Sequence, residues 1–461
     1  MPTPPRANGP TLLKGLGTWD AALLTIGSTL GTGIFLTTGD IARVLPHTGL
    51  ILLVWIAGGL LTLAGALTYA ELGAMFPRAG GQYHYLKEAY GPLWGFLFGW
   101  TAFFVVNTGG TGALAVGFGE YLGFFLPFFS TSHVLWSVPV GPLTWTVSGG
   151  QVAGVLVITF LCAVNYVGVR EGAGVQNLVT VVKVGSLVAL AGLGLFSPAV
   201  VRPAWTAPLP SGNVLMAFGV GMIAVLWAFD GWYGATASAG EMRTPERSLP
   251  LGLITGTAIL TLFYVLLNVV YVRALPTETL AGTSRVAEAA ASVMFGPVGA
   301  RLVSLAVLIS IFGCISSTIV WTPRIYLAMA QDGLFFAHLA RIHARFRTPA
   351  TCIVVQGVWA GLLTLSGTFE ELYTYTIFAA TAFHAATGLA VIVLRRTRPA
   401  ERRPYRTWGY PWVPAAFVLS CVLLVGNTLA TKPAESLIGV GLVAIGLPAF
   451  WWWRRAVATR S

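Results

Sequence analysis

Long apolar runs, separated by short polar segments, recur along the whole chain. A run of about 18 residues or more is long enough to cross a hydrocarbon core about 30 Å thick as a helix. Exposed backbone groups are so costly in lipid that such runs are expected to be helical. The pattern predicts an all-α membrane protein with twelve transmembrane helices, at residues 19–38, 47–73, 92–125, 148–168, 175–196, 213–240, 250–275, 297–330, 350–367, 370–394, 411–430 and 436–453.

Small and polar residues interrupt two of these runs. The first contains GSTLGTGIF (27–35), with three glycines and three hydroxyls, and the sixth contains WAFDGWYGATASAG (227–240). Runs one and six each begin a set of five, and paired interruptions at corresponding positions indicate an inverted repeat with a substrate site between its halves. We therefore expect a single membrane domain over residues 1–461, with repeats at 19–196 and 213–394 and two appended helices at 411–453.

The first interruption is interpreted as a break in a helix, with a GxxxG packing face as the alternative. Two closely spaced glycines weaken the helix. In the broken helix, the N–H groups near Thr32, Gly33 and Ile34 begin the second half and suit a carboxylate. Carbonyls near Thr29 end the first half and suit an ammonium group. The break thus predicts a clamp for an amino acid zwitterion.

The second interruption supplies the remainder of the predicted site. Carbonyls near Trp227, Ala228 and Asp230 complete the ammonium site, and Trp227 or Phe229 closes over the substrate as an aromatic gate. Core packing or lipid contact is the alternative for these aromatic residues. An acid at membrane depth is costly and indicates function. Asp230 either contacts the substrate amine or fixes the unwound segment.

Lys183 is the only lysine inside a predicted membrane segment. Its ammonium group either extends to an interface or stays inside the bundle. Ser316, Ser317 and Asn107 are candidate cavity residues, or else hydrogen-bonding contacts between helices.

Composition and charge support the membrane assignment. Hydrophobic residues make up 56% of the chain and charged residues only 9%, against about a quarter charged in soluble domains. With a cytoplasmic N-terminus, 20 of the 27 lysines and arginines fall on the cytoplasmic side and six on the other. This asymmetry follows the positive-inside rule, so we expect a multi-pass protein of the cell membrane with both termini cytoplasmic. The net charge of +11 then needs no nucleic-acid partner.

Several long stretches together resemble a known family. They are GSTLGTGIF, YAELGAMFPRAGGQYHYLKEAYGPLWGFLFGW (69–100), AVNYVGVREGAGVQNLVTVVKV (163–184), LWAFDGW (226–232), EMRTPERSLP (241–250) and RIYLAMAQDGLFFAHLARIHARFRTP (324–349). In this order they resemble the amino acid-polyamine-organocation (APC) superfamily, and within it bacterial relatives of the L-amino acid transporter (LAT) family, including serine/threonine exchangers.

The resemblance implies a LeuT-like fold with a five-plus-five inverted repeat and broken helices 1 and 6, working by alternating access. It implies that the backbone near Thr32, Gly33 and Ile34 holds the substrate carboxylate. It also implies that Lys183 replaces the second sodium site of related transporters, where Ser316 and Ser317 are also expected.

The chain departs from better-known members of this family at a few positions. Asp230 stands where human relatives carry glycine, and Thr29 replaces a larger aliphatic residue. The segment 126–147 contains no cysteine, so the disulfide that joins animal relatives to a heavy chain is not expected.

The sequence therefore predicts a transporter that moves small or neutral L-amino acids, either as an exchanger or as a sodium-independent, proton-linked carrier. Its expected partners are the amino acid substrate and the lipid bilayer, with no chemical cofactor and no metal. A membrane enzyme is disfavoured because no paired-carboxylate or metal-ligand spacing occurs. A channel is disfavoured because rings of like groups are absent.

Overall fold

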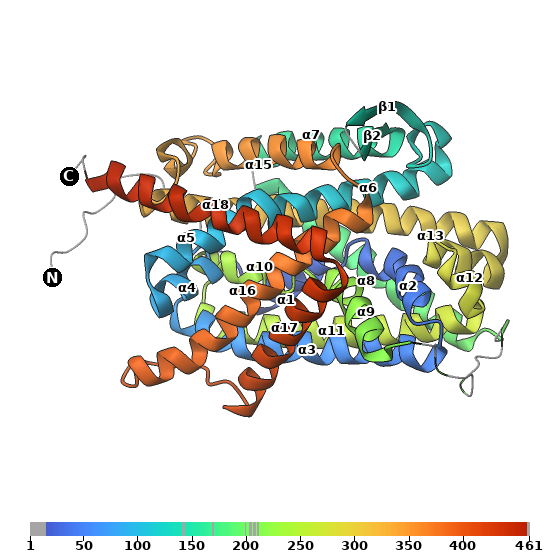
Figure 1. Cartoon of the computed structure of the whole chain (residues 1–461), viewed down its shortest axis with the longest axis horizontal. Coiled ribbons are helices and arrows are strands. Elements are labelled where there is room, and N and C mark those ends of the chain that lie inside the picture. Colours follow the sequence, from blue (N-terminus) through green and yellow to red (C-terminus); the bar gives the residue numbers. More distant parts are fainter. Residues whose placement is uncertain are drawn as a thin grey trace.

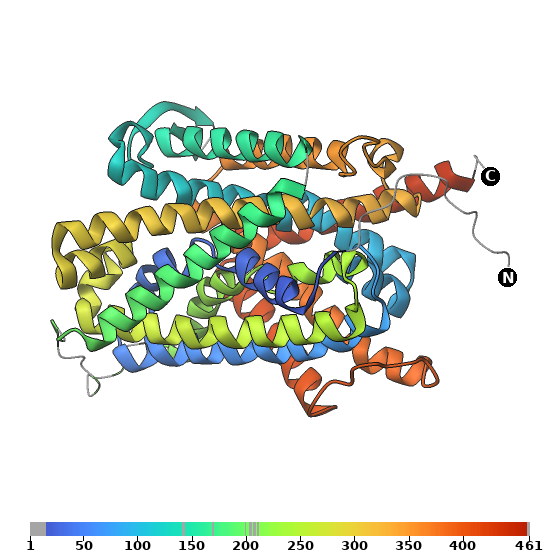
Figure 2. The ribbon, with the colours of Figure 1, turned by 180° about the vertical axis from the view of Figure 1, so that it is seen from behind.

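The computed structural model of the protein describes residues 15–140, 143–167, 170–198, 200–201, 205, 209 and 212–458. Long helices lie side by side along the longest axis and surround shorter helices near the centre (Figure 1 and Figure 2). The two chain ends, predicted to be cytoplasmic, lie outside the described residues.

The first predicted repeat contains helices in all five of its apolar runs. They are α1 (Thr18–Thr29), α2 (Gly33–Val44), α3 (Thr48–Met75), α4 (Gln82–Tyr90), α5 (Pro92–Thr101), the π-helical turn η1 (Ala102–Val106), α6 (Asn107–Phe125), α7 (Gly149–Val167) and α8 (Arg170–Phe196). Helices α1 and α2 form one bent pair with an angle of 45° between them. The predicted break in the first run is confirmed.

The second predicted repeat and the appended segment are also helical. The helices are α9 (Val214–Phe229), α10 (Gly234–Ala237), α11 (Pro245–Ala274), α12 (Thr277–Ala281), α13 (Val286–Trp321), α14 (Pro323–Gln331), α15 (Ala350–Thr364), α16 (Phe369–Thr397), α17 (Trp412–Thr431) and α18 (Pro433–Ala458). Short 3-10 turns occupy Pro127–Phe129 (η2), Ala239–Glu241 (η3) and Ala337–Ala340 (η4).

Eight spans in the described part of the chain are long and apolar enough to cross a membrane, or nine if α1 and α2 form one span. Helices α9 and α15 are apolar but shorter. The prediction of a mostly helical, multi-pass membrane protein is therefore confirmed.

One detail of the prediction is corrected. The chain is not all-α, because β1 (Val134–Val140) and β2 (Leu143–Ser148) form an antiparallel hairpin between α6 and α7. Valine and tryptophan occur in both strands and threonine occurs in β2, and all three residue types favour extended backbone. Helix α13 is kinked at the non-helical Gly296 (φ +72°), so the predicted segment 297–330 starts where the second helical stretch starts and is preceded by a separate stretch from Val286.

Small residues bring the central helices close together. Helix α1 packs on α11, where a side chain on Gly252 or Gly256 would meet Ala21 or Thr25. Such small-residue contacts are the usual means of helix association in membranes. Helix α2 packs on α9, so the two interrupted segments meet inside the bundle.

Candidate functional site

The break between α1 and α2 spans Leu30, Gly31 and Thr32. Leu30 leaves helical geometry at ψ 83°, and the Gly31 N–H donates to the Thr29 carbonyl at 2.8 Å. Thr32 precedes α2, and Gly33 is its first residue. The first N–H groups of a helix have no acceptor within it and carry partial positive charge. The N–H groups at Thr32, Gly33 and Ile34 are therefore suited to a carboxylate.

The second break follows α9 at Asp230 and Gly231. Asp230 ends the helix at ψ 146°, and Gly231 takes a left-handed conformation at φ +93° that favours glycine. The Ser28 hydroxyl donates to the Gly231 carbonyl at 2.9 Å. The Tyr264 hydroxyl donates to the Ala228 carbonyl at 3.1 Å and lies 3.5 Å from the Thr29 carbonyl. These bonds tie the two breaks together.

Lys183 lies inside the bundle, next to the first break. The side chain is fully buried, and Nζ donates to the carbonyls of Gly27 at 3.0 Å and Leu30 at 3.1 Å. This placement excludes the interpretation in which Lys183 extends to an interface. An ammonium group here satisfies carbonyls that the end of α1 leaves without helical partners.

Helix α13 supplies two further donors to the same break. The Ser310 hydroxyl donates to the Leu30 carbonyl, and Cys314 Sγ donates to the Ser28 carbonyl, both at 3.1 Å. Ser316 and Ser317, predicted for this role, follow on the same helix, and Ser317 is buried. Ser310 and Cys314, which bond the break, precede the predicted serines by two to seven residues along α13.

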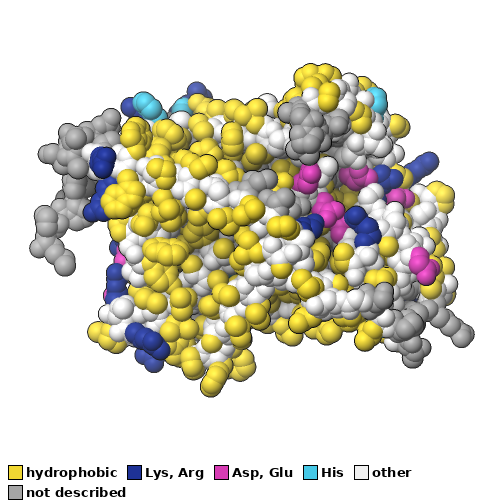
Figure 3. Space-filling model, in the orientation of Figure 1, with side chains coloured by type: hydrophobic (Ala, Val, Ile, Leu, Met, Phe, Trp, Pro, Cys, Tyr) yellow, Lys and Arg dark blue, Asp and Glu magenta, His cyan; other side chains and the backbone are white. Residues whose placement is uncertain are grey.

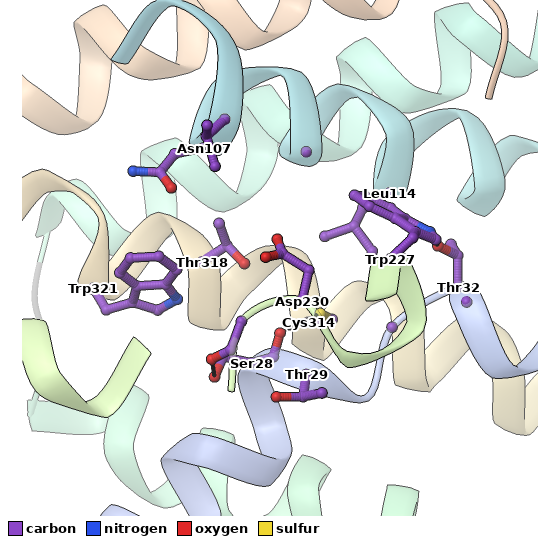
Figure 4. A pocket seen from close by; sticks show the side chains of 15 residues that line it. Ser28, Thr29, Thr32, Asn107, Leu114, Trp227, Asp230, Cys314, Thr318 and Trp321 are labelled. Carbon is purple, nitrogen blue, oxygen red and sulfur yellow. Dashed lines mark hydrogen bonds between the residues drawn. The ribbon is translucent and has the colours of Figure 1, made fainter. Parts of the chain in front are cut away.

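A small pocket lies where the two breaks meet (Figure 4). Its free volume is about 20 Å³, room for roughly one water molecule. The side chain of Asp230 points into it between Thr318 and Leu114 (Figure 4). The lining residues are Ser28, Thr29, Gly31, Thr32, Gly33, Val106, Asn107, Gly110, Leu114, Trp227, Asp230, Gly231, Cys314, Thr318 and Trp321. Ile34 and Ala228, predicted around the substrate, are buried directly beside this lining.

Trp227 closes one side of the pocket. Its indole Nε1 donates to the Thr32 hydroxyl at 3.1 Å, and its ring stacks on Tyr373 with centroids 5.8 Å apart. Phe369 meets the same ring edge-on at 6.0 Å. Phe229, the other predicted gate residue, points elsewhere, since it packs against Trp55 and Tyr264 and does not line the pocket. On a helix, neighbouring positions face different sides, so only one of this pair can face the pocket.

A wide vestibule opens on the other side of this aromatic group. Its volume is about 1110 Å³, and its lining includes Phe369, Glu120 and Trp145 of β2. On the face shown in Figure 3, most of the acidic side chains gather below the hairpin, and hydrophobic side chains cover much of the rest. We call this side of the molecule the hairpin end.

The opposite end is closed by a buried ion pair and by a short N-terminal segment at Gly15 and Leu16, which we call the strap. Arg324 pairs with Glu241, and both side chains are largely buried. The N–H groups of Gly15 and Leu16 donate to the Glu241 carbonyl at 2.9 and 3.1 Å, and the Arg243 N–H donates to the Leu16 carbonyl. The pocket is thus separated from the hairpin end by a few aromatic side chains, and from the opposite end by a packed layer.

Sequence reasoning missed three residues that hold the breaks together. Tyr264, Ser310 and Cys314 lie within long apolar helices, where tyrosine, serine and cysteine commonly pack against neighbouring helices. Ser28 was visible in the interrupted motif, but its bond across to Gly231 depends on how α1 meets the second break.

Two broken helices that meet at a buried pocket inside a helical bundle are the arrangement of secondary transporters. Comparison with known sequences gives the same class. The family described as "Amino acid permease" matches residues 16–444. The chain belongs to this family, within the APC superfamily, and is an amino acid transporter and not an enzyme.

Characterised relatives cover almost the whole chain. The serine/threonine exchanger SteT of Bacillus subtilis is 31% identical over 451 residues, which cover 97% of this chain and 98% of SteT. The human b(0,+)-type amino acid transporter 1 is 31% identical over 444 residues, covering 95% and 87%. The human cystine/glutamate transporter is 26% identical over 447 residues, covering 96% and 84%.

Proposed function

We propose that this protein moves small or neutral L-amino acids across the cytoplasmic membrane as a sodium-independent exchanger, by alternating access. The observation that carries the proposal is the placement of the Lys183 ammonium group on the Gly27 and Leu30 carbonyls. A fixed positive charge occupies the place beside the broken helix where a coupling sodium ion would otherwise sit. The similarity to SteT, a serine/threonine exchanger, supports exchange over net uptake.

In this proposal the substrate carboxylate binds the N–H groups at Thr32, Gly33 and Ile34. The substrate amine binds between the carbonyls near Thr29, Trp227 and Ala228 and the carboxylate of Asp230. Because Asp230 points into the pocket (Figure 4), we favour direct contact with the amine over a role confined to the loop. Trp227 is the aromatic gate, and it must move because the closed pocket is too small for an amino acid.

The proposed architecture is a LeuT-like fold of twelve spanning helices with a five-plus-five inverted repeat. A helix is present in every one of the twelve predicted runs, and the two breaks fall in the first and sixth. We further propose that both termini are cytoplasmic, that the hairpin end is extracellular, and that the chain transports without a disulfide-linked heavy chain. All four cysteines are buried, which supports the last point.

Uptake of radiolabelled alanine, serine, threonine and leucine into proteoliposomes tests the function. We expect uptake only into vesicles preloaded with amino acid, at the same rate in sodium and in choline buffer. A strict sodium requirement would contradict the proposal. Uptake into empty vesicles that rises with an inward proton gradient would favour the proton-linked alternative.

Lys183→Met keeps the length of the side chain and removes its charge and donors. We expect the exchange rate to fall at least about tenfold, because the buried carbonyls of Gly27 and Leu30 then lose their charged hydrogen-bond donor. Ser186→Ala is the matched control on the same helix, since the Ser186 hydroxyl donates to the Lys183 carbonyl of its own helix. The exchange rates of the two variants are measured in parallel at equal protein density. An exchange rate of Lys183→Met equal to that of the wild type would contradict the assigned role.

A further inference from the structure

A second polar cavity lies at the hairpin end, away from the pocket between the breaks. Its volume is about 100 Å³, and residues of α2, α9, α16 and α17 line it, together with Lys432 directly after α17. A cavity needs about 10–15 Å³ to hold one water, so this cavity has room for several water-sized groups. Asp40, Arg43 and Glu370 line both this cavity and the vestibule, so a solute in the vestibule can reach it. We call it the side cavity.

Four charged groups of alternating sign line the side cavity. Arg43 pairs with Asp40 within α2 and lies 3.7 Å from Glu370 of α16. Lys432 Nζ donates to Glu370 at 2.8 Å, and the Tyr373 hydroxyl donates to Asp40 at 3.0 Å. The contact between Arg43 and Glu370 is the longest of these ion pairs and therefore the weakest.

The hydroxyl groups and the apolar wall complete the side cavity. Thr428 and Thr431 donate to carbonyls of their own helix, which leaves their oxygens able to accept a further hydrogen bond. Thr374 is almost fully buried, and within the described part of the chain its hydroxyl has no hydrogen-bond partner. Val44, Val220 and Ile223 form the apolar side. A buried hydroxyl without a partner costs free energy unless something in the cavity satisfies it.

We propose that the side cavity is an outer binding site for the same zwitterionic amino acids that the protein transports, an inference that rests on the proposed function. The substrate carboxylate binds Arg43 and Lys432. The substrate ammonium binds Asp40 and Glu370, and takes the place of the long contact between Arg43 and Glu370. Thr374 bonds the polar end of a short side chain, and the valines and Ile223 face its methyl or methylene groups.

This chemistry matches a zwitterion better than a simple ion. Two cations and two anions face the same space, so an ion of either sign meets repulsion as well as attraction. A zwitterion presents one charge of each sign a few ångströms apart and pairs with both. Tyr373 joins Asp40 and also stacks on Trp227, so an occupied side cavity lies one side chain away from the gate of the central pocket.

Equilibrium binding of radiolabelled L-serine to the purified full-length protein in nanodiscs tests the proposal. We expect two serines per chain at saturation. The double variant Arg43→Gln, Lys432→Gln is expected to bind one, and Thr374→Val to bind the outer serine about fivefold more weakly. Arg402→Gln is the control, because Arg402 forms an exposed ion pair with Glu246, outside the cavity, and is expected to bind two.

The outcomes separate this inference from the transport proposal. One serine per wild-type chain, or two in the double variant, would overturn the outer site while leaving serine transport intact. In that case the four charged groups of the side cavity serve only to hold α2, α16 and α17 together. No serine bound and no uptake of any amino acid would overturn both. Thr374→Val keeps the test informative if the double variant does not fold.

Discussion

Gly33 lies at a close approach of the two broken helices. A side chain there would overlap the backbone of Ala228, which fixed backbone atoms cannot relieve. The same residue is the first of α2, where its N–H is proposed to meet the substrate carboxylate. The close approach of the two helices and the proposed substrate contact therefore both depend on the absence of a Cβ atom at Gly33.

Gly33→Ala is expected to reduce amino acid exchange by at least about tenfold, because the methyl group pushes α2 away from α9 and displaces the N–H groups. Gly185→Ala in α8 is the matched control, since no atom lies within 4 Å of its added Cβ, and its exchange is expected to stay near wild type. Uptake kinetics and binding of labelled substrate measure both variants. Undiminished substrate affinity in Gly33→Ala would contradict the proposed carboxylate site.

At the scale of elements, contacts between several helices and turns close the end of the molecule opposite the hairpin. The 3-10 turn η3 follows the second broken segment, and the strap at Gly15 and Leu16 bonds to its last residue, Glu241. Arg324 of α14 pairs with the same glutamate. This turn therefore links the second broken helix to α14, and α14 follows directly on α13, which also bonds the first break.

Glu241→Gln is expected to destabilise this closure strongly, because removing one partner leaves the Arg324 charge buried and unpaired, at about 3–5 kcal/mol. Glu246→Gln is the control, since its pair with Arg402 is exposed and such pairs contribute about 0–1 kcal/mol. Thermal unfolding of the two purified variants measures the difference. Equal midpoints would show that the buried pair does not hold the closure.

A second inter-element link fixes the arginine-rich segment after α16. By composition this segment resembles an ordinary solvated loop. In the structure, Glu71 of α3 accepts from Arg395 at 2.7 and 2.9 Å and from the Thr407 N–H at 2.7 Å. A single buried carboxylate thus holds the last turn of α16 and the segment after it against α3, a contact between residues more than 300 positions apart.

At the scale of the whole molecule, the two ends differ. The hairpin end carries the vestibule, while the opposite end is packed closed. A carrier that alternates access needs one end open and the other closed at a time. In the proposed alternating-access cycle, this conformation would load from the hairpin end once the aromatic group around Trp227 moves.

Single cysteines test the proposed orientation in intact cells. Gly282→Cys lines the vestibule, and Trp408→Cys lies exposed in the segment after α16. A membrane-impermeant maleimide is expected to label Gly282→Cys in intact cells, and to label Trp408→Cys only after the cells are opened. Background labelling is expected to be low because all four native cysteines are buried. Labelling in the reverse order would show that the hairpin end faces the cytoplasm.

By itself, the sequence determined the class of protein, the positions of its helical runs and the two breaks. These features follow from local composition, because apolar length indicates a span and adjacent glycines indicate an interrupted helix. It also singled out Asp230 and Trp227, which line the pocket, and Lys183, which bonds the break. A charge or an interruption in an apolar run is visible without knowing its neighbours.

Only the tertiary structure decided which partners these residues meet. Whether Trp227 or Phe229 faces the pocket depends on the rotation of α9 against α2 and α11. The bonds from Tyr264, Ser310 and Cys314, and the charged series around the side cavity, join helices distant in the chain. The β-hairpin depends on pairing between two short strands. Such contacts are set by how helices rotate and pack, and a pattern along one segment does not carry that information.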